Sequence, residues 1–145
     1  MRQIKRVVAA ICVGGALMGA YAIGATAGEK KADPRVFELR TYTPGPGKMD
    51  ALLARFRNHT TKLFEKHGIK NIGYWVTADT KLPEQDQKLI YLVAHKSREA
   101  AATNWKEFGG DPEWKEVHAE SEKDGKLAVK VESVYLNPTD FSPIK

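Results

Sequence analysis

A change of hydrophobic period between residues 35 and 64 constrains the fold of this chain most strongly. Residues 36–43 alternate as a β-strand does, whereas residues 49–64 repeat with the spacing of an amphipathic helix. The four residues between them, Pro44-Gly45-Pro46-Gly47, stop both elements, because proline lacks an amide donor and glycine favours turn conformations. This stretch is therefore predicted to be a strand, a turn and a helix, which is half of a βαβ-type repeat.

Three further segments have the composition of β-strands. Residues 69–78 are enriched in β-forming and aromatic side chains, and residues 88–96 are apolar at nearly every central position. A short run that is apolar on both sides is typical of a strand whose two faces are covered. We therefore expect residues 88–96 to be the central strand and the alternating residues 126–136 to be the last strand.

Helices are predicted by apolar spacing and by their end signals. The first covers residues 49–67 and ends at Gly68, which suits the left-handed turn that closes many helices. The second starts after Ser97, a typical N-cap, and stops at Gly109-Gly110. Asp111-Pro112 then restarts a helix, because aspartate caps free amides and proline suits the first helical position.

The resulting order predicts an α+β fold with the ferredoxin-like β-α-β-β-α-β arrangement. An antiparallel sheet with both helical regions on one face leaves its other face bare. We expect that bare face to carry Val36, Tyr42 and Val93, mixed with charged side chains. A monomer would expose too much apolar surface there, so a homodimer is predicted, in which two sheets form a dimeric α/β barrel.

The composition indicates one domain of balanced charge. A chain of 145 residues with 42% hydrophobic side chains can form one ordinary core. The net charge of +5 comes largely from Arg2, Lys5 and Arg6, and beyond residue 27 there are 20 basic and 18 acidic residues. Phosphate binding relies on clustered cations, so no nucleic-acid partner is predicted.

The first 27 residues have the pattern of a secretory signal peptide. Basic MRQIKR precedes an apolar run over residues 7–25, and small side chains lead up to Ala27. Cleavage there predicts an exported protein, periplasmic or secreted, with no membrane association. The alternative is an uncleaved membrane anchor, because the run approaches bilayer-spanning length. The only cysteine, Cys12, lies in this segment, so the mature chain would have no thiol or disulfide.

Four separated motifs resemble those of the NIPSNAP family. They are VFELRTYTPGPGKMDALLARF from residue 36, NIGYW from residue 71, WKEFGGDPEW from residue 105 and LNPTDFSP from residue 136. The resemblance implies a dimeric α/β-barrel domain over residues 36–138, after a linker over 28–35 and before a tail over 139–145. Sister families on this fold include cofactor-independent monooxygenases, haem-degrading enzymes and isomerases, but the resemblance implies no settled reaction.

The candidates for lining a ligand cavity are Arg40, Tyr42, Trp75, Tyr91 and His95. Arg40 can orient an anionic or carbonyl-bearing ligand through its planar guanidinium, and Tyr42 can donate a hydrogen bond. Trp75 and Tyr91 offer apolar surface to a flat molecule. His95 titrates near neutral pH and is the candidate base.

Structural interpretations of the same residues stay open. In the first, Glu38 and Arg40 pair with Lys130 and Glu132 of the last strand across the sheet or the dimer interface. In the second, His95 is a solvated strand end. Under both, the residues stabilise the fold and contact no ligand.

No metal site or cofactor is predicted. His118 and Glu122 lie one helical turn apart, but no second ligand pair has a recognisable spacing. The first hypothesis for the function is a homodimer that binds a small apolar or aromatic molecule inside its barrel. One alternative is a cofactor-independent monooxygenase- or isomerase-like enzyme, with His95, Arg40 and Tyr42 as catalytic residues. The other is a protein-interaction module with a filled barrel.

Overall fold

The computed structural model describes residues 35–145, except residues 80–81 and 84–85. The domain described here lies within residues 31–145. The predicted signal peptide lies outside the described residues, as does all but the last residue of the predicted linker. Within the described part of the chain, no helix is both long and apolar enough to cross a bilayer.

Four antiparallel strands form a single sheet, as predicted, in the order β2-β3-β1-β4. Their bounds are β1 Val36–Pro44, β2 Lys70–Val76, β3 Leu89–His95 and β4 Ala128–Leu136. The two inner strands are β3, which was predicted to be central, and β1, which pairs with β3 on one side and with β4 on the other. In this register Arg40 lies opposite both Tyr91 and Ser133. The strand order and the alternation of strands and helices confirm the ferredoxin-like α+β fold.

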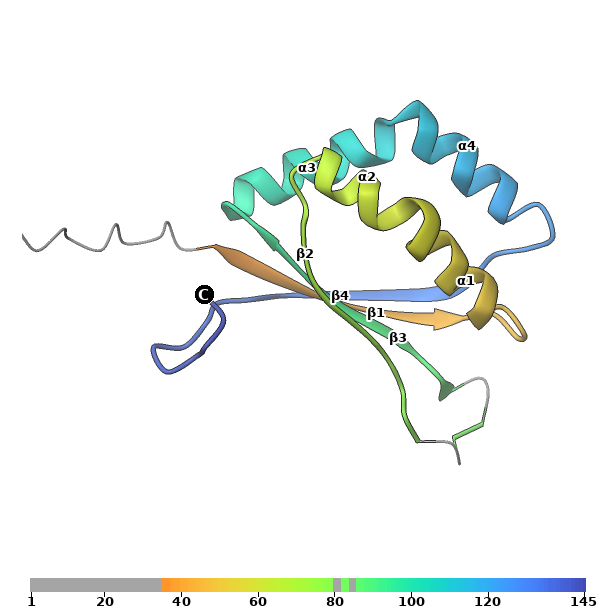
Figure 1. Ribbon diagram of the computed structural model, residues 1–145, viewed down its shortest axis with the longest axis horizontal. Coiled ribbons are helices and arrows are strands. Elements are labelled where there is room, and N and C mark those ends of the chain that lie inside the picture. Colours follow the sequence, from red (N-terminus) through yellow and green to blue (C-terminus); the bar gives the residue numbers. More distant parts are fainter. Residues whose placement is uncertain (1–34, 80–81, 84–85) are drawn as a thin grey trace, which may run out of the picture. The chain divides into compact units, whose positions relative to one another are not determined.

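The helices cover one face of this sheet (Figure 1). They are α1 Met49–Arg55, the π-helical turn η1 Phe56–Thr60, α2 Thr61–Lys66, α3 Arg98–Gly110 and α4 Pro112–Ser121. The first three run on without a break and together form the predicted helix over residues 49–67. The π-helical turn was not predicted. Inside it the hydroxyl of Thr60 donates to the carbonyl oxygen of Arg55, five residues earlier, at 3.3 Å.

The predicted helix caps are present. The Ser97 hydroxyl accepts from the amide of Ala100 at 3.1 Å, and an Asp111 carboxylate oxygen accepts from the amide of Glu113 at 2.8 Å. Gly68 has φ of 71°, the left-handed conformation expected after a helix. Helix α3 continues two residues beyond its predicted end, through Gly110, and stops where Asp111 becomes extended.

The two faces of the sheet are the reverse of the prediction. Glu38 accepts a hydrogen bond from Trp105 of α3, and the ring of Tyr42 meets Phe56 edge to face at 5.7 Å. This side of β1 therefore faces the helices. Because Val36 and Val93 share it, all three residues expected on the bare face lie on the helix-covered face.

The physical reason for this reversal is that the apolar side chains of β1 do not mark its helix-covered side. Phe37 and Leu39 point away from the helices, whereas the polar pair Glu38 and Arg40 points toward them, where the two side chains bond to each other. The opposite surface, called here the helix-free face, carries a largely apolar set: Phe37, Leu39, Thr41, Trp75, Ile90, Leu92, Val134 and Leu136.

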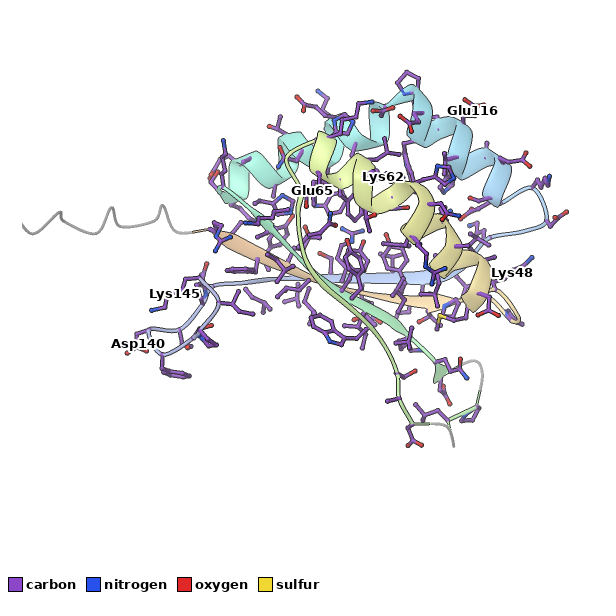
Figure 2. The ribbon with its side chains drawn as sticks, viewed as in Figure 1. Lys48, Lys62, Glu65, Glu116, Asp140 and Lys145 are labelled. Carbon is purple, nitrogen blue, oxygen red and sulfur yellow. The ribbon has the colours of Figure 1, made fainter. Side chains whose placement is uncertain are left out.

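The core lies between the helix layer and the sheet, where aromatic rings pack together with leucine, isoleucine and valine side chains (Figure 2). Tyr91 of β3 is fully buried and contacts the rings of Phe56, Phe64 and Tyr74 at centroid distances of 5.2, 6.0 and 5.3 Å. Edge-to-face and stacked rings add to the stabilisation that comes from burial alone. The aromatic core fixes the helices over β1 and β3.

Candidate functional site

A buried carboxylate lies at the centre of the predicted residues. Glu38 is 1% exposed and accepts hydrogen bonds from Arg40 at 2.7 Å and from the indole nitrogen of Trp105 at 2.6 Å. The hydroxyl of Ser133 donates to it as well, and His95 Nε2 lies 3.3 Å away. Strand β1, its neighbours β3 and β4, and helix α3 each contribute to this group, which we call the Glu38 cluster.

The cluster keeps Glu38 ionised. Burial alone would raise the pKa of this carboxyl, but hydrogen bonds from His95, Ser133 and Trp105, together with the charge of Arg40, outweigh it and lower the pKa to about 2. Glu38 therefore carries a negative charge at every physiological pH. A carboxylate of this kind holds donors in place and is a poor proton acceptor.

Arg40 is held over an aromatic surface as well as by Glu38. Its guanidinium carbon lies 4.4 Å from the centroid of Trp105 and 5.8 Å from that of Tyr42. Arg40 and Glu38 bond to each other, so the ion pairs with Lys130 and Glu132 across the sheet, which the structural interpretation allowed, are not formed within one subunit. Lys130 and Glu132 instead pair with each other at 2.8 Å.

His95 is buried within the Glu38 cluster. The amide nitrogen of Asn104 donates to the Gly68 carbonyl oxygen at 3.0 Å, which fixes the amide orientation, and lies 3.3 Å from His95 Nδ1. This assigns a tautomer in which Nδ1 accepts from Asn104 and Nε2 donates to Glu38. The side chain has no exposed surface, so His95 is not solvated as one interpretation expected. Its role as a base stays a prediction, and both of its nitrogens are already occupied.

Tyr42 and Tyr91 line the same side of the sheet as Arg40 and His95, whereas Trp75 does not. Burial, together with the neighbouring Tyr42, raises the pKa of Tyr91 well above its usual range. Trp75 is 55% exposed on the helix-free face, with its ring lying across Gly73, where an added Cβ would be 2.5 Å from the ring. The structure thus brings four of the five predicted residues together and separates the fifth.

The helix-free face contains a hollow of about 280 Å³ beneath the C-terminal residues. Phe37, Leu92 and Leu136 line it from the sheet, and Pro138 and Ile144 line it from the C-terminal segment. The lining is mostly apolar, and its volume approaches that of small-ligand pockets in proteins. None of the five predicted residues lines this hollow.

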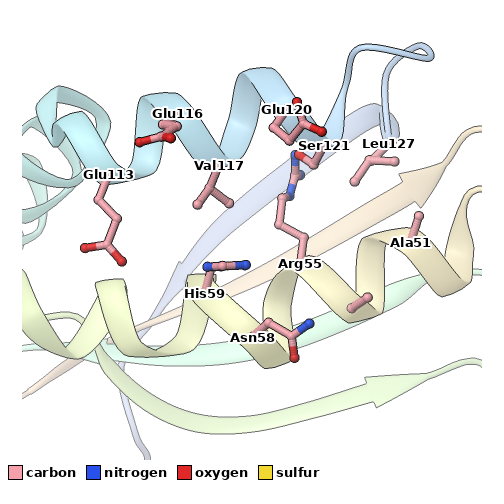
Figure 3. A pocket seen from close by; sticks show the side chains of 11 residues that line it. Ala51, Arg55, Asn58, His59, Glu113, Glu116, Val117, Glu120, Ser121 and Leu127 are labelled. Atoms are coloured by element: carbon pink, nitrogen blue, oxygen red, sulfur yellow. The ribbon is translucent and has the colours of Figure 1, made fainter.

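A second hollow, of about 560 Å³, is an open groove between the α1–η1 helix and α4 (Figure 3). Arg55 lines the groove, and its side chain is 5% exposed. It is buried because its guanidinium donates to the Ser121 hydroxyl at 3.1 Å and to Glu122 at 3.0 Å. Sequence periodicity could not reveal this contact, since it depends on where α4 packs.

Trp105, Ser133 and Asn104 are the parts of the Glu38 cluster that the sequence did not reveal. Trp105 packs edge to face on Phe64 of α2, at 5.2 Å, and also donates to Glu38 of β1. The signal available was Glu38 between the apolar residues Phe37 and Leu39 of a predicted strand, because a buried carboxylate needs hydrogen-bond donors. Among the described residues, no cluster of three or more metal-ligating side chains occurs.

Comparison with known proteins shows where the chain belongs. The NIPSNAP family model matches residues 37–143, which is most of the chain. No curated protein sequence matches it. A NIPSNAP family protein with unknown function from Agrobacterium tumefaciens strain C58 is 20% identical, with a TM-score of 0.66 and coverage of 78% of this chain and 96% of that one.

Two further solved structures have the same fold. A second NIPSNAP family protein from Agrobacterium tumefaciens is 25% identical, with a TM-score of 0.66 and coverage of 77% and 92% of the two chains. An uncharacterized NIPSNAP-like domain protein from Burkholderia xenovorans is 22% identical, with a TM-score of 0.63 and coverage of 77% and 90%. The family match and the shared fold together show that this protein is a member of the NIPSNAP family.

Proposed function

We propose that this protein is an exported homodimer that binds a small apolar molecule between the helix-free faces of its two copies. The observation that carries the proposal is the apolar hollow beneath the C-terminal residues, which opens on the helix-free face. A molecule bound there would contact the floor of Phe37, Leu92 and Leu136. Apolar contact over such a floor favours ligands without charge.

Exposure of the helix-free face supports the dimer. Trp75 is 55% exposed, Val134 is 50% exposed and Leu136 is 40% exposed, and Phe141 of the C-terminal segment is 84% exposed. Large apolar side chains gathered on one surface are typical of protein interfaces. Covering this face with the same face of a second copy would remove these side chains from water and enclose the hollow.

The binding site proposed here differs from the one expected from the sequence. Arg40, Tyr42, Tyr91 and His95 lie on the helix-covered face, where they bond to Glu38 or pack in the aromatic core. We therefore assign these four residues to the stability of the fold and place the ligand on the opposite face. Trp75 lies on that face and stays a candidate contact.

An apolar fluorescent probe, N-phenyl-1-naphthylamine, tests the proposed site. We expect wild-type protein to enhance its fluorescence saturably, and Leu92→Trp, which fills the hollow, to weaken binding about tenfold or more. Ile90→Trp is the matched control, because Ile90 lies two residues away on the same strand and face but does not line the hollow. Equal losses in both variants, or no saturable binding by wild type, would contradict the proposal.

Export is part of the proposal because of the N-terminal pattern of the sequence. The basic start, the apolar run and the small side chains before Gly28 meet the requirements for secretion and cleavage. A mature chain starting at Gly28 would contain no cysteine, so its stability outside the cytoplasm would depend on its core and on the second copy.

A further inference from the structure

Trp75 presents a flat aromatic surface to solvent on the helix-free face. The residue is 55% exposed, and its ring lies across Gly73, where a Cβ atom would come within 2.5 Å of the ring. Gly73 does not adopt the left-handed conformation, so glycine is needed here for the space it leaves and not for backbone freedom. The strand therefore holds a large apolar ring in place on an exposed sheet surface, as interface anchors are held.

The strand register arranges the side chains of the helix-free face in rows across the sheet. Two neighbouring rows are apolar: Gly73 beneath the Trp75 ring, Leu92, Leu39 and Val134 in one, and Phe37 and Leu136 in the next. The two rows on the other side are polar on β1 and β4: Thr41 and Glu132, then Thr43 and Lys130. The face thus changes from apolar to polar along its strands.

This change favours one way of stacking two copies. When two sheets pack face to face with aligned strands, the two-fold axis between them runs either along the strands or across them. An axis across the middle of the strands would place Glu132 and Lys130 of each copy against the apolar rows of the other. An axis along the strands brings apolar rows onto apolar rows and leaves both charges outside them, which avoids covering a charge with an apolar surface.

An axis along the strands exchanges the two edges of the sheet. In the order β2-β3-β1-β4 it sets β2 of one copy against β4 of the other. The Trp75 ring and Val134 lie in the same row, on β2 and β4, so they meet across the interface. Leu136 follows Val134 by two residues on the same face, about 7 Å along the strand, and lines the apolar hollow.

We infer that Trp75 of the partner subunit packs on Val134 and forms one wall of the ligand site, so that each hollow is complete only in the dimer. This inference rests on the proposed function and adds to it the residue that the second copy contributes. It also accounts for the 50% exposure of Val134 and for the glycine beneath the Trp75 ring.

Nuclear Overhauser effects (NOEs) in the wild-type protein measure the contact without any substitution. Within one copy, Trp75 and Val134 lie on opposite edges of the sheet, three strand spacings or about 14 Å apart, which is too far for an NOE. We expect NOEs between the Trp75 ring and the Val134 methyl groups in dimers that combine an isotope-labelled and an unlabelled copy. Their absence, or NOEs between the two Trp75 rings, would overturn the inference.

Two variants separate the contributed wall from the hollow itself. Trp75→Ala removes the wall and should weaken binding of N-phenyl-1-naphthylamine about fivefold. Leu92→Trp fills the hollow of its own copy. Val76→Ala is the matched control for Trp75→Ala, because Val76 is the next residue of β2 and is 47% exposed but points to the opposite face. It should bind the probe as wild type does.

Mixed dimers of the two variants show which copy supplies Trp75. The Trp75→Ala copy keeps its hollow and receives Trp75 from the Leu92→Trp copy, so one of the two sites is whole. Refolding the variants together should restore wild-type affinity at about a quarter of the wild-type capacity, because about half of the dimers are mixed.

The two possible failures have different signatures. A mixture that binds no better than its components, while wild type binds saturably, would overturn the contribution of the partner and leave the proposed function standing. Wild type without saturable binding would contradict the proposed function, and the NOEs would still decide the contact between Trp75 and Val134.

Discussion

The indole nitrogen of Trp105 lies 2.6 Å from a carboxylate oxygen of Glu38 and donates a hydrogen bond that joins helix α3 to the central strand β1. The same indole packs edge to face on Phe64 of α2, at 5.2 Å. A single side chain therefore contacts both helical regions and the sheet. Because the bond ends on a buried charge, its loss affects every other donor in the Glu38 cluster.

Replacing Glu38 should destabilise the domain far more than its size suggests. In Glu38→Gln an amide that donates meets side chains that also donate, from Arg40, Trp105 and Ser133, and a buried arginine loses its counter-charge. We expect the free energy of unfolding in urea to fall by about 3 kcal/mol or more. Glu132→Gln on the helix-free face should change it by less than about 0.5 kcal/mol. Similar losses in both would show that the cluster contributes little.

The free energy of unfolding should decrease at acidic pH because Glu38 becomes protonated. Its pKa is about 2 in the folded protein against 4.5 as its ordinary value, so the unfolded chain takes up this proton first as the pH falls. The stabilisation is complete above pH 4.5 and is lost as the pH falls from 4.5 towards 2. A carbon-13 NMR titration of the Glu38 carboxyl checks this directly, and a midpoint near 4.5 in the folded protein would contradict it.

Urea unfolding of wild type and Glu38→Gln distinguishes the contribution of Glu38 to the pH dependence of stability from that of other acidic groups. Hydrogen bonds from Lys66 and His67 hold the pKa of Asp111 below its usual range. Protonation of Asp111 in acid therefore also lowers the free energy of unfolding. Glu38→Gln leaves Asp111 in place. The difference in slope between wild type and Glu38→Gln from pH 4.5 downwards therefore reports Glu38 alone.

The hydroxyl inside the π-helical turn should stabilise the helix. Thr60 is buried and donates to the Arg55 carbonyl oxygen at 3.3 Å, whereas Thr103 makes a bond of the same length to the Glu99 carbonyl oxygen while exposed. Thr60→Val should lower the free energy of unfolding by about 1 kcal/mol because it removes a buried hydrogen bond. Thr103→Val should change it by less than about 0.5 kcal/mol. The reverse order in urea titrations would be inconsistent with this role.

Processing of the N-terminus can be measured on the full-length chain expressed in a Gram-negative host. We expect the periplasmic fraction to contain a protein whose intact mass corresponds to a start at Gly28. Ala27→Arg should block this product, because a large charged side chain does not fit the small-residue position before the cut. Membrane-bound protein of full-length mass from the wild-type sequence would instead support the anchor.

Sequence patterns were sufficient for the elements of this fold because their signals are local. Proline and glycine at residues 44–47, the N-caps Ser97 and Asp111, and the left-handed Gly68 each act within a few residues of their own position. The faces of the sheet were predicted incorrectly because alternation gives two sides without saying which one the helices cover. Both sides of β1 are at least partly buried, so the position of its apolar side chains did not indicate which face the helices cover.

The site was harder to predict than the fold because its partners come from distant elements. Glu38 meets Ser133 across 95 residues and Trp105 across 67, and no spacing in the sequence records either contact. Arg55 likewise meets Glu122 across 67 residues. The sequence did indicate that hydrogen-bond donors were needed. A glutamate in a buried strand requires such donors, and the indole N–H of a tryptophan can be one.

The account depends most on the helix-free face as the meeting surface of two copies, and light scattering coupled to size-exclusion chromatography tests this directly. Val134 and Val131 lie on the same strand with exposures of 50% and 45%, but Val134 points to the helix-free face and Val131 to the other. We predict that wild type and Val131→Lys elute with twice the subunit mass and that Val134→Lys elutes as a monomer. A monomeric wild type, or two variants that behave alike, would contradict the account.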